Sequence, residues 1–456
     1  MVPKLGTSIV RYHQSIGKVK AKVTAVNMND LILVSTDDHI IEPPNMFDGR
    51  LPAKYADRAP RVVGDSKIGF NWVFDGAKAS QLALAATAGR GVGGKAQQYH
   101  EEPKSFAEIR PGTYDVHERV KDMDANGVLG SLNFPSFPRF SGALFAQVGQ
   151  KDSDLALAVV RAYNDWHIDE WCGSYPERFI PCALGPIWDV HLMAAEMRRV
   201  AAKGVHAVAF SMNPFGLGFP SLHDSYWDPF WETCEENQIV VCMHIGSGAA
   251  MIQTSPDAPM LTRVTCSGIN IYPTAADLIW SPMMNKFPNL TFALSEGGIG
   301  WVPYFLERAD FTYKHHVADI EEHPFYGETP SQRFNRRIVT CFIDDAHGVE
   351  NLHLMNVENV TWECDYPHPD STWPYTPEEA WPYLQRVNND EIVNKITHLN
   401  AMRIFNFDPF KHIPKEHATV AALRARSAGH DVSYVPGKQY GLGKITQSMM
   451  GSMRTS

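Results

Sequence analysis

The sequence predicts an α/β fold, a distorted (β/α)8 TIM barrel with long insertions after its first and fifth strands. Eight short apolar, β-branched runs recur along the chain, and stretches with helical patterns separate them. Near-continuous apolar strands are typical of parallel sheets buried on both faces. Eight such strands favour a closed barrel over an open doubly wound sheet, and no GxGxxG motif follows the first strand to indicate a dinucleotide-binding fold.

The predicted strands end in polar residues, and the stretches between them carry signals for helix ends. The strands span residues 31–39, 128–135, 179–187, 205–212, 239–246, 290–298, 338–345 and 360–368. Asp189 is placed to cap a helix that Gly204 ends, and Asp228 is placed to cap one with Pro229 in its first turn. This alternation of strand and helix predicts successive βα units within one domain.

Two insertions and two terminal segments surround the predicted barrel domain, residues 31–409. Residues 43–115 and 247–289 exceed the usual loop length and leave from the carboxyl ends of strands, where barrel enzymes build substrate pockets and lids. We interpret residues 1–30 as an N-terminal extension. The basic, Gly/Ser-containing segment 410–456 is expected to be an arm across the surface or across a partner subunit.

The composition excludes several classes of partner. Hydrophobic residues make up 44% of the chain, which suffices for a large core, and the net charge of −10 argues against nucleic acid. No apolar run approaches the roughly 18–20 residues that span a bilayer, and the N-terminus lacks the features of a signal peptide. The seven cysteines show no CxxC spacing. We therefore expect a cytoplasmic protein with reduced thiols that acts on a small molecule, without a membrane or nucleic-acid partner.

Metal-ligand residue types stand at the ends of three predicted strands. Asp37 and His39 are two residues apart and project from one face of the first strand, whereas Asp38 points to the other face. His244 ends the fifth strand and Asp365 ends the eighth. Alone, each is as well explained by packing or by a structural pair, but the carboxyl ends of barrel strands meet at one face. Imidazole and carboxylate ligands suit a divalent metal such as Zn, Mn or Fe.

Five segments of the sequence resemble the amidohydrolase-related family. They are residues 34–44, 161–166, 242–248, 295–310 and 364–374, and the resemblance runs from about residue 31 to Phe407. This is the branch of the amidohydrolase superfamily that contains aminocarboxymuconate-semialdehyde decarboxylase and resorcylate-type decarboxylases. The resemblance implies a distorted TIM barrel, one or two divalent metals with a bound water, and a homodimer. It places the metal ligands at Asp37, His39, His244 and Asp365.

Glu296, after the sixth strand, departs from the pattern of the decarboxylating relatives, which have a histidine there. Three roles are open for its carboxylate: ligand of a second metal, general base for the metal-bound water, or support that orients a ligand histidine. The substitution favours hydrolysis over decarboxylation.

Several further residues are candidates for the site, each with a structural alternative. Glu42 either supports the metal ligands or caps the turn before Pro43, and Arg139 pairs with a substrate carboxylate or with a structural partner. His368, three residues after Asp365, is a candidate proton shuttle. The remaining candidates line a substrate pocket or belong to the core or surface; they are Phe137, Phe140, His167, His223, Trp301 and Trp373.

Two reactions and one non-catalytic role compete. We expect hydrolysis of an ester, amide or thioester (including an acyl-CoA) by a metal-activated water, with Asp365 or Glu296 accepting its proton. The alternative is non-oxidative decarboxylation of an aromatic or conjugated carboxylate. A barrel that uses its metal only for stability is disfavoured, because structural sites are typically closed four-ligand cages. Release of CO2 separates decarboxylation from hydrolysis, which releases an alcohol, acid, amine or thiol.

Overall fold

Parallel strands form the centre of the molecule in the computed structural model, which describes residues 26–65, 69–79, 86–88, 103–248, 251–316 and 327–433. Within these ranges one sheet has the order β1-β5-β6 and another the order β7-β8-β9-β10-β11-β12, all pairs parallel. The strands are β1 Val34–Ile40, β5 Gly130–Pro135, β6 Phe179–Ile180, β7 Ala183–Leu184, β8 Ala207–Phe210, β9 Val240–His244, β10 Phe292–Ser295, β11 Ile338–Phe342 and β12 Val360–Trp362.

Each of the eight predicted runs contains a strand at the expected place. The third run holds both β6 and β7, which residues 181–182 separate, so one predicted strand links the two sheets. Every residue of β1, β5, β9, β10 and β11 is buried, as near-continuous apolar composition predicts. The predicted (β/α)8 class of fold is confirmed.

The two sheets meet at a seam between β12 and β1, where individual hydrogen bonds replace a regular ladder. The hydroxyl oxygens of Thr36 and Thr361 are 2.9 Å apart. Beyond the end of β12, the Asp365 N–H donates to the carbonyl of Asp37 (2.8 Å) and the His39 N–H donates to that of Tyr366 (2.7 Å). The seam therefore joins the two chain segments that carry most of the predicted metal ligands.

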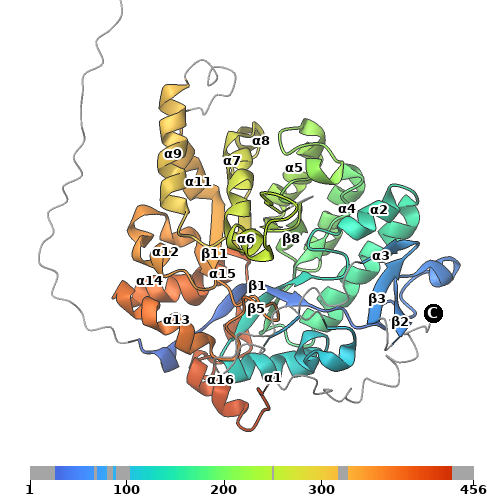
Figure 1. Ribbon diagram of the computed structural model, residues 1–456, viewed down its shortest axis with the longest axis horizontal. Coiled ribbons are helices and arrows are strands. Elements are labelled where there is room, and N and C mark those ends of the chain that lie inside the picture. Colours follow the sequence, from blue (N-terminus) through green and yellow to red (C-terminus); the bar gives the residue numbers. More distant parts are fainter. Residues whose placement is uncertain are drawn as a thin grey trace, which may run out of the picture.

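Helices cover the outside of the strands (Figure 1). Their bounds are α1 Val116–Asn126, α2 Ala143–Gly149, α3 Ser153–Asp165, α4 Val190–Ala201, α5 Asp228–Glu236, α7 Tyr272–Trp280, α8 Met283–Lys286, α9 Val302–His315, α11 Pro330–Arg337, α12 Ala346–Glu350, α13 Thr376–Leu384, α14 Asp390–Asn394 and α15 Asn400–Ile404. Asp189 caps α4 as predicted, accepting from two N–H groups of its first turn. Asp228 is instead the first residue of α5, because a 3-10 turn at Ser225–Trp227, capped by Asp224, runs directly into the helix.

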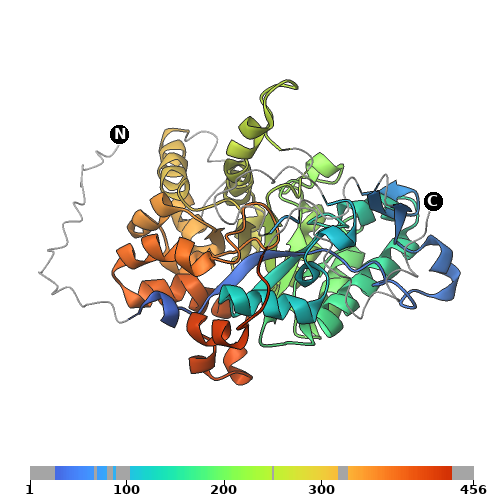
Figure 2. The same ribbon diagram turned by 60° about the horizontal axis from the view of Figure 1, so that its bottom comes forward.

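Both predicted insertions contain secondary structure of their own. The first holds the antiparallel sheet β2 (Arg61–Asp65), β3 (Gly69–Phe74) and β4 (Ala77–Lys78). The second begins with α6 (Met260–Thr265), which projects from the body of the molecule (Figure 2), and then supplies the barrel helices α7 and α8. Within the described ranges, no helix combines the length and hydrophobicity that crossing a bilayer requires.

Part of the C-terminal segment packs on its own chain. Helix α16 (Val420–Arg426) lies beside α1 (Figure 1), and its Val420 N–H donates to the carbonyl of Leu31 (2.9 Å) at the entrance to β1. Val420 and Leu423 are buried in this contact. The remainder of the predicted tail, from residue 434, and the predicted N-terminal extension up to residue 25 lie outside the described residues.

Candidate metal centre

The predicted ligands from three strands converge at the carboxyl ends of the barrel strands. Asp37 and His39 lie in β1, His244 is the last residue of β9, and Asp365 follows β12. All four side chains are at most 1% exposed. Since a buried charge without a partner is costly, four such groups in one place indicate a common purpose.

The nitrogen and oxygen atoms of these side chains face one another. His39 Nε2 is 3.4 Å from Asp37 Oδ1, 3.1 Å from Asp365 Oδ1 and 3.2 Å from His244 Nε2. His244 Nε2 is 3.2 Å from Asp37 Oδ2. Two imidazole nitrogens and two carboxylates at these distances match the ligand set of a metal-binding cluster.

Glu296 and His368 complete the cluster. Glu296 Oε2 is 3.2 Å from His244 Nε2, and His368 Nδ1 is 3.0 Å from Asp365 Oδ1. Two overlapping sets have donor atoms within 4.8 Å of one another, Asp37-His39-His244 and His39-Asp365-His368, so His39 belongs to both. Glu296 and Asp365 have φ of 61° and 56°, a left-handed backbone that is uncommon outside glycine and often marks a functional site.

Burial and mutual repulsion shift the pKa values of the cluster. Burial is the main cause that raises the pKa of Asp37, Glu296 and Asp365 well above the usual range, and neighbouring carboxylates add to the shift. Burial also lowers the pKa of His39 far below its usual value and that of His244 to about 3. Without a cation, burial therefore favours neutral imidazoles and protonated carboxylic acids. A neutral imidazole can bind a cation directly, and a cation would displace the proton from each acid.

The donor atoms of the cluster fit a divalent cation. None of the four carboxylate oxygens of Asp37 and Asp365 accepts a hydrogen bond from a described residue, although all are buried. The Nδ1 of His244 lies against the carbonyl of Ile245, which can only accept, so Nδ1 carries the proton and Nε2 presents a lone pair to the cluster. Neutral imidazole and unsatisfied carboxylate oxygens are the ligands of Zn, Mn and Fe(II).

Aromatic rings form a wall of the cluster. The Phe140 ring lies 4.2 Å from that of His244 and 4.9 Å from that of His39, measured between centroids. Phe134, from β5, lies 5.1 Å from the His244 ring. Carboxylates therefore line one side of the cluster, and the side that faces the loop after β5 is apolar.

The other predicted residues are placed differently. Glu42 accepts the N–H groups of Ser136 and Phe137 (2.9 and 2.8 Å), so it ties the loop after β1 to the loop after β5. The Phe137 ring stacks on Trp72, 4.3 Å between centroids, and is 2% exposed within the core. The backbone of Arg139 has φ of 64° in a tight turn, and its side chain is exposed.

Four aromatic or imidazole candidates have structural contacts away from the ligand atoms. The Trp301 indole N–H donates to the carbonyls of Gly297 and Gly298 (3.0 Å each), which supports the loop after Glu296. The Trp373 indole N–H donates to the Asp122 carbonyl (2.9 Å). His223 pairs with Asp277 at 3.3 Å on the surface, and His167 is buried, accepting from the Cys182 N–H (3.3 Å).

One buried carboxylate at the cluster escaped the sequence analysis. Glu363 accepts from the Glu296 N–H (3.2 Å) and from the Cys341 thiol (2.5 Å), and burial raises its pKa to about 7. Glu363 precedes Asp365 by two residues. The two-residue alternation of a strand, which put Asp37 and His39 on one face of β1, would therefore have put Glu363 on the face of Asp365. Its role is to hold the backbone from which the Glu296 side chain reaches the cluster.

Comparison with known proteins relates the chain to amidohydrolases and decarboxylases. Residues 114–407 match the model of a family described as amidohydrolase, and no match was found among curated proteins. A solved amidohydrolase from Mycobacterium avium subsp. paratuberculosis K-10 is similar at 19% identity and a TM-score of 0.64, over 83% of this chain and 100% of its own. The 5-carboxyvanillate decarboxylase of Sphingomonas paucimobilis is similar at 18% identity and a TM-score of 0.54, over 83% and 100%.

A third similar structure carries a ligand. It is the 5-carboxyvanillate decarboxylase of Novosphingobium aromaticivorans DSM 12444, complexed with manganese and 4-hydroxy-3-methoxy-5-nitrobenzoic acid. Its identity is 19% and its TM-score 0.56, over 82% of this chain and 96% of its own. At these identities the likeness establishes the fold.

Proposed function

The chain belongs to the amidohydrolase family, and from this premise we propose that it is a metal-dependent carboxy-lyase that removes CO2 from an aromatic or conjugated carboxylate. The observation that carries the proposal is the position of the Asp365–His368 pair, 3.0 Å apart and joined to the candidate ligand cluster through His39. Ligands for a cation and a group able to hold a proton thus lie side by side. Decarboxylating enzymes among the similar structures support this choice of reaction.

Asp37, His39, His244 and Asp365 would hold the cation. Their unsatisfied oxygens and the Nε2 lone pair of His244 fit it, and the manganese in the Novosphingobium structure makes Mn2+ the first ion to test. When bound, a divalent cation supplies positive charge that holds the substrate carboxylate and an adjacent oxygen in place.

Proton transfer falls to the Asp365–His368 pair. The bond between the ring carbon and the carboxylate carbon breaks, its electron pair stays on the ring carbon, and CO2 leaves. A proton held by His368, whose Nδ1 lies 3.0 Å from Asp365 Oδ1, then forms the new C–H bond. As an anionic ligand of the cation, Asp365 would stabilise the positive charge of a protonated His368 imidazole beside it.

Phe140 would position a flat substrate. Its ring already lies against the imidazoles of His39 and His244, and a substrate ring that packs beside it would direct its carboxylate towards the ligand cluster. Such packing also keeps water from the ring carbon while the proton is transferred.

The direct test is CO2 release from a panel of hydroxybenzoates by the Mn2+-loaded protein in D2O. We expect one CO2 for each product, with one deuterium at the carbon that lost the carboxylate. His368→Gln should lose most of this activity, while His223→Gln, a change at an exposed imidazole, should retain it. Turnover of esters, amides or thioesters without any CO2 release would refute the proposal.

Hydrolysis remains a second candidate because of one observation, the carboxylate of Glu296. Its Oε2 is 3.2 Å from His244 Nε2, where it is positioned to take a proton from an attacking water. In a hydrolase, Glu296→Gln should abolish ester or thioester turnover while Mn2+ remains bound. In a carboxy-lyase, the same change should leave CO2 release from the active hydroxybenzoate within about tenfold of the unmodified protein.

A further inference from the structure

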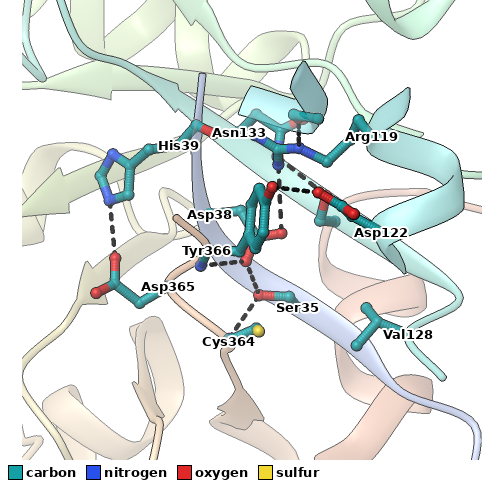
Figure 3. Close-up of polar contacts among 12 residues, drawn as sticks. Ser35, Asp38, His39, Arg119, Asp122, Val128, Asn133, Cys364, Asp365 and Tyr366 are labelled. Atoms are coloured by element: carbon teal, nitrogen blue, oxygen red, sulfur yellow. Dashed lines mark hydrogen bonds and ion pairs between the residues drawn. The ribbon is translucent and has the colours of Figure 1, made fainter. Parts of the chain in front are cut away.

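The seam between β1 and β12 lies directly beside the ligand cluster, on the face of β1 opposite to Asp37 and His39. Asp38 is 2% exposed there, and its Oδ1 accepts from the Ser35 hydroxyl (2.9 Å) and from the Tyr366 N–H (3.2 Å). Ser35 in turn accepts the N–H of Cys364 (2.8 Å). Figure 3 shows these contacts joining β1 to the segment that carries Asp365. Asp38 and Ser35 therefore take the place of ladder hydrogen bonds at this point.

The guanidinium group of Arg119, on α1, reaches both sides of the same seam (Figure 3). It donates to the carbonyl of His39, and its Nη1 lies 3.7 Å from Asp38 Oδ2. Its Cζ is 4.4 Å from the centroid of the Tyr366 ring, and its Nε donates to the Gly112 carbonyl (2.6 Å). At 1% exposure this cation is enclosed by groups that belong to, or adjoin, His39 and Asp365.

Helix α1 holds Tyr366 at a second point. The Tyr366 hydroxyl donates to Asp122 Oδ2 (2.5 Å), and Asp122 is three residues after Arg119, on the same face of the helix. Arg110 pairs with the other oxygen of Asp122 at 2.6 Å. The ring and the hydroxyl of Tyr366 are thus fixed from α1, immediately after the candidate ligand Asp365.

We infer that Arg119 is a positioning residue of the metal centre: by contacting the His39 carbonyl, Asp38 and the Tyr366 ring, it sets the distance between the ligands of β1 and those that follow β12. The inference rests on the proposed cation site. Its physical basis is that a buried planar guanidinium has a fixed geometry and few alternative partners, so the seam cannot widen without leaving the charge unsatisfied. A merely stabilising arginine would have no such effect on the ligand atoms.

Arg178 provides a matched control for this role. It is also buried, donates to two backbone carbonyls, those of Leu129 (2.5 Å) and Val128 (3.0 Å), and pairs with Asp124 at 2.7 Å. It precedes β6 and so lies at the amino ends of the strands, opposite to the ligand cluster. Arg119→Lys and Arg178→Lys each keep the charge and lose the planar fork.

The test is calorimetric titration of chelator-treated protein with Mn2+, beside denaturant unfolding of the metal-free protein. We expect both lysine variants to lose stability, but only Arg119→Lys to weaken Mn2+ affinity, by about 10- to 100-fold, the range seen when groups that orient metal ligands are changed. Equal Mn2+ affinity of Arg119→Lys, Arg178→Lys and the unmodified protein would overturn the inference. An unmodified protein that binds no Mn2+ would instead overturn the cation site, and the inference with it.

Asp38→Asn keeps the inference testable if Arg119→Lys does not fold. The variant keeps an acceptor oxygen for the Ser35 hydroxyl and the Tyr366 N–H, and it removes the charge that faces Arg119 Nη1. We expect a loss of Mn2+ affinity of a few fold and a changed electron paramagnetic resonance line shape of the bound ion, because Arg119 loses one of its contacts at the seam. An unchanged spectrum together with unchanged affinity in Asp38→Asn would count against the positioning role.

Discussion

The imidazole ring of His368 is stacked on that of His39, with centroids 3.7 Å apart and an angle of 26° between the ring planes. The stack brings a residue from the loop after β12 against a residue of β1, and it leaves His368 Nδ1 3.0 Å from Asp365 Oδ1. His39 faces the candidate cation, and His368, which would hold the proton, faces the carboxylate of Asp365. The two proposed tasks of the site, holding the substrate and protonating it, are thereby assigned to adjacent rings.

We predict that His368→Phe separates these tasks. The phenyl ring can still stack on His39, so Mn2+ affinity should remain within about threefold, whereas kcat for CO2 release should fall by about 100-fold or more, the usual worth of a positioned general acid. Calorimetry and a CO2 assay on the same preparation measure the two quantities. A parallel loss of Mn2+ binding would show that His368 is needed as a ligand.

We predict that Mn2+ stabilises the fold and that Asp37 is required for this effect. A ligand at 100 times its dissociation constant adds about 2.7 kcal/mol to the free energy of unfolding. Both oxygens of Asp37 are buried without a hydrogen bond, so Asp37→Asn should abolish the Mn2+-dependent gain. Denaturant unfolding with and without Mn2+ measures it, with Asp277→Asn on the surface as control. A full Mn2+-dependent gain in Asp37→Asn would exclude Asp37 as a ligand.

Glu42 should contribute to stability through the loop after β5. Its two oxygens accept the N–H groups of Ser136 and Phe137, and Ala at this position would leave both donors buried without a partner. Each buried unsatisfied donor costs about 1–3 kcal/mol, so Glu42→Ala should lower the free energy of unfolding by about 2–6 kcal/mol. Glu42→Gln keeps one acceptor oxygen and should lose less. Equal losses in urea unfolding of the two variants would argue against this account.

His167 should make stability depend on pH. Burial lowers its pKa to about 3, whereas an unfolded histidine titrates near about 6.5. Between these values the unfolded chain binds the extra proton, so the free energy of unfolding falls as pH falls below about 6.5, and His167 has no such effect at higher pH. His167→Gln, whose amide oxygen can still accept from the Cys182 N–H, should reduce the slope between pH 6 and 5 by about 1 kcal/mol per pH unit.

Urea unfolding at several pH values measures this slope. His191 is exposed at the start of α4 and offers a matched histidine, so His191→Gln should keep the slope of the unmodified protein. An identical slope in His167→Gln would mean that other buried groups account for all of the acid sensitivity.

The barrel and the convergence of its candidate ligands follow from local patterns. Buried parallel strands need continuous apolar runs, and the two-residue alternation of a strand is enough to put Asp37 and His39 on one face and Asp38 on the other. The carboxyl ends of the strands then bring His244 and Asp365 to the same place, because all strands of a parallel barrel run in one direction.

Only the tertiary structure decides which residues outside the strands reach this centre. Phe137 and Phe140 stand three residues apart in one loop, yet Phe140 contacts His39 and His244 while Phe137 stacks in the core on Trp72. Arg119 lies on a helix with no motif around it and contacts the seam only because α1 packs there. The sequence by itself determined the strands and the face on which their polar residues lie, since both depend on short-range periodicity. Contacts across the seam and around the loops depend on how distant elements pack, and no local pattern encodes that.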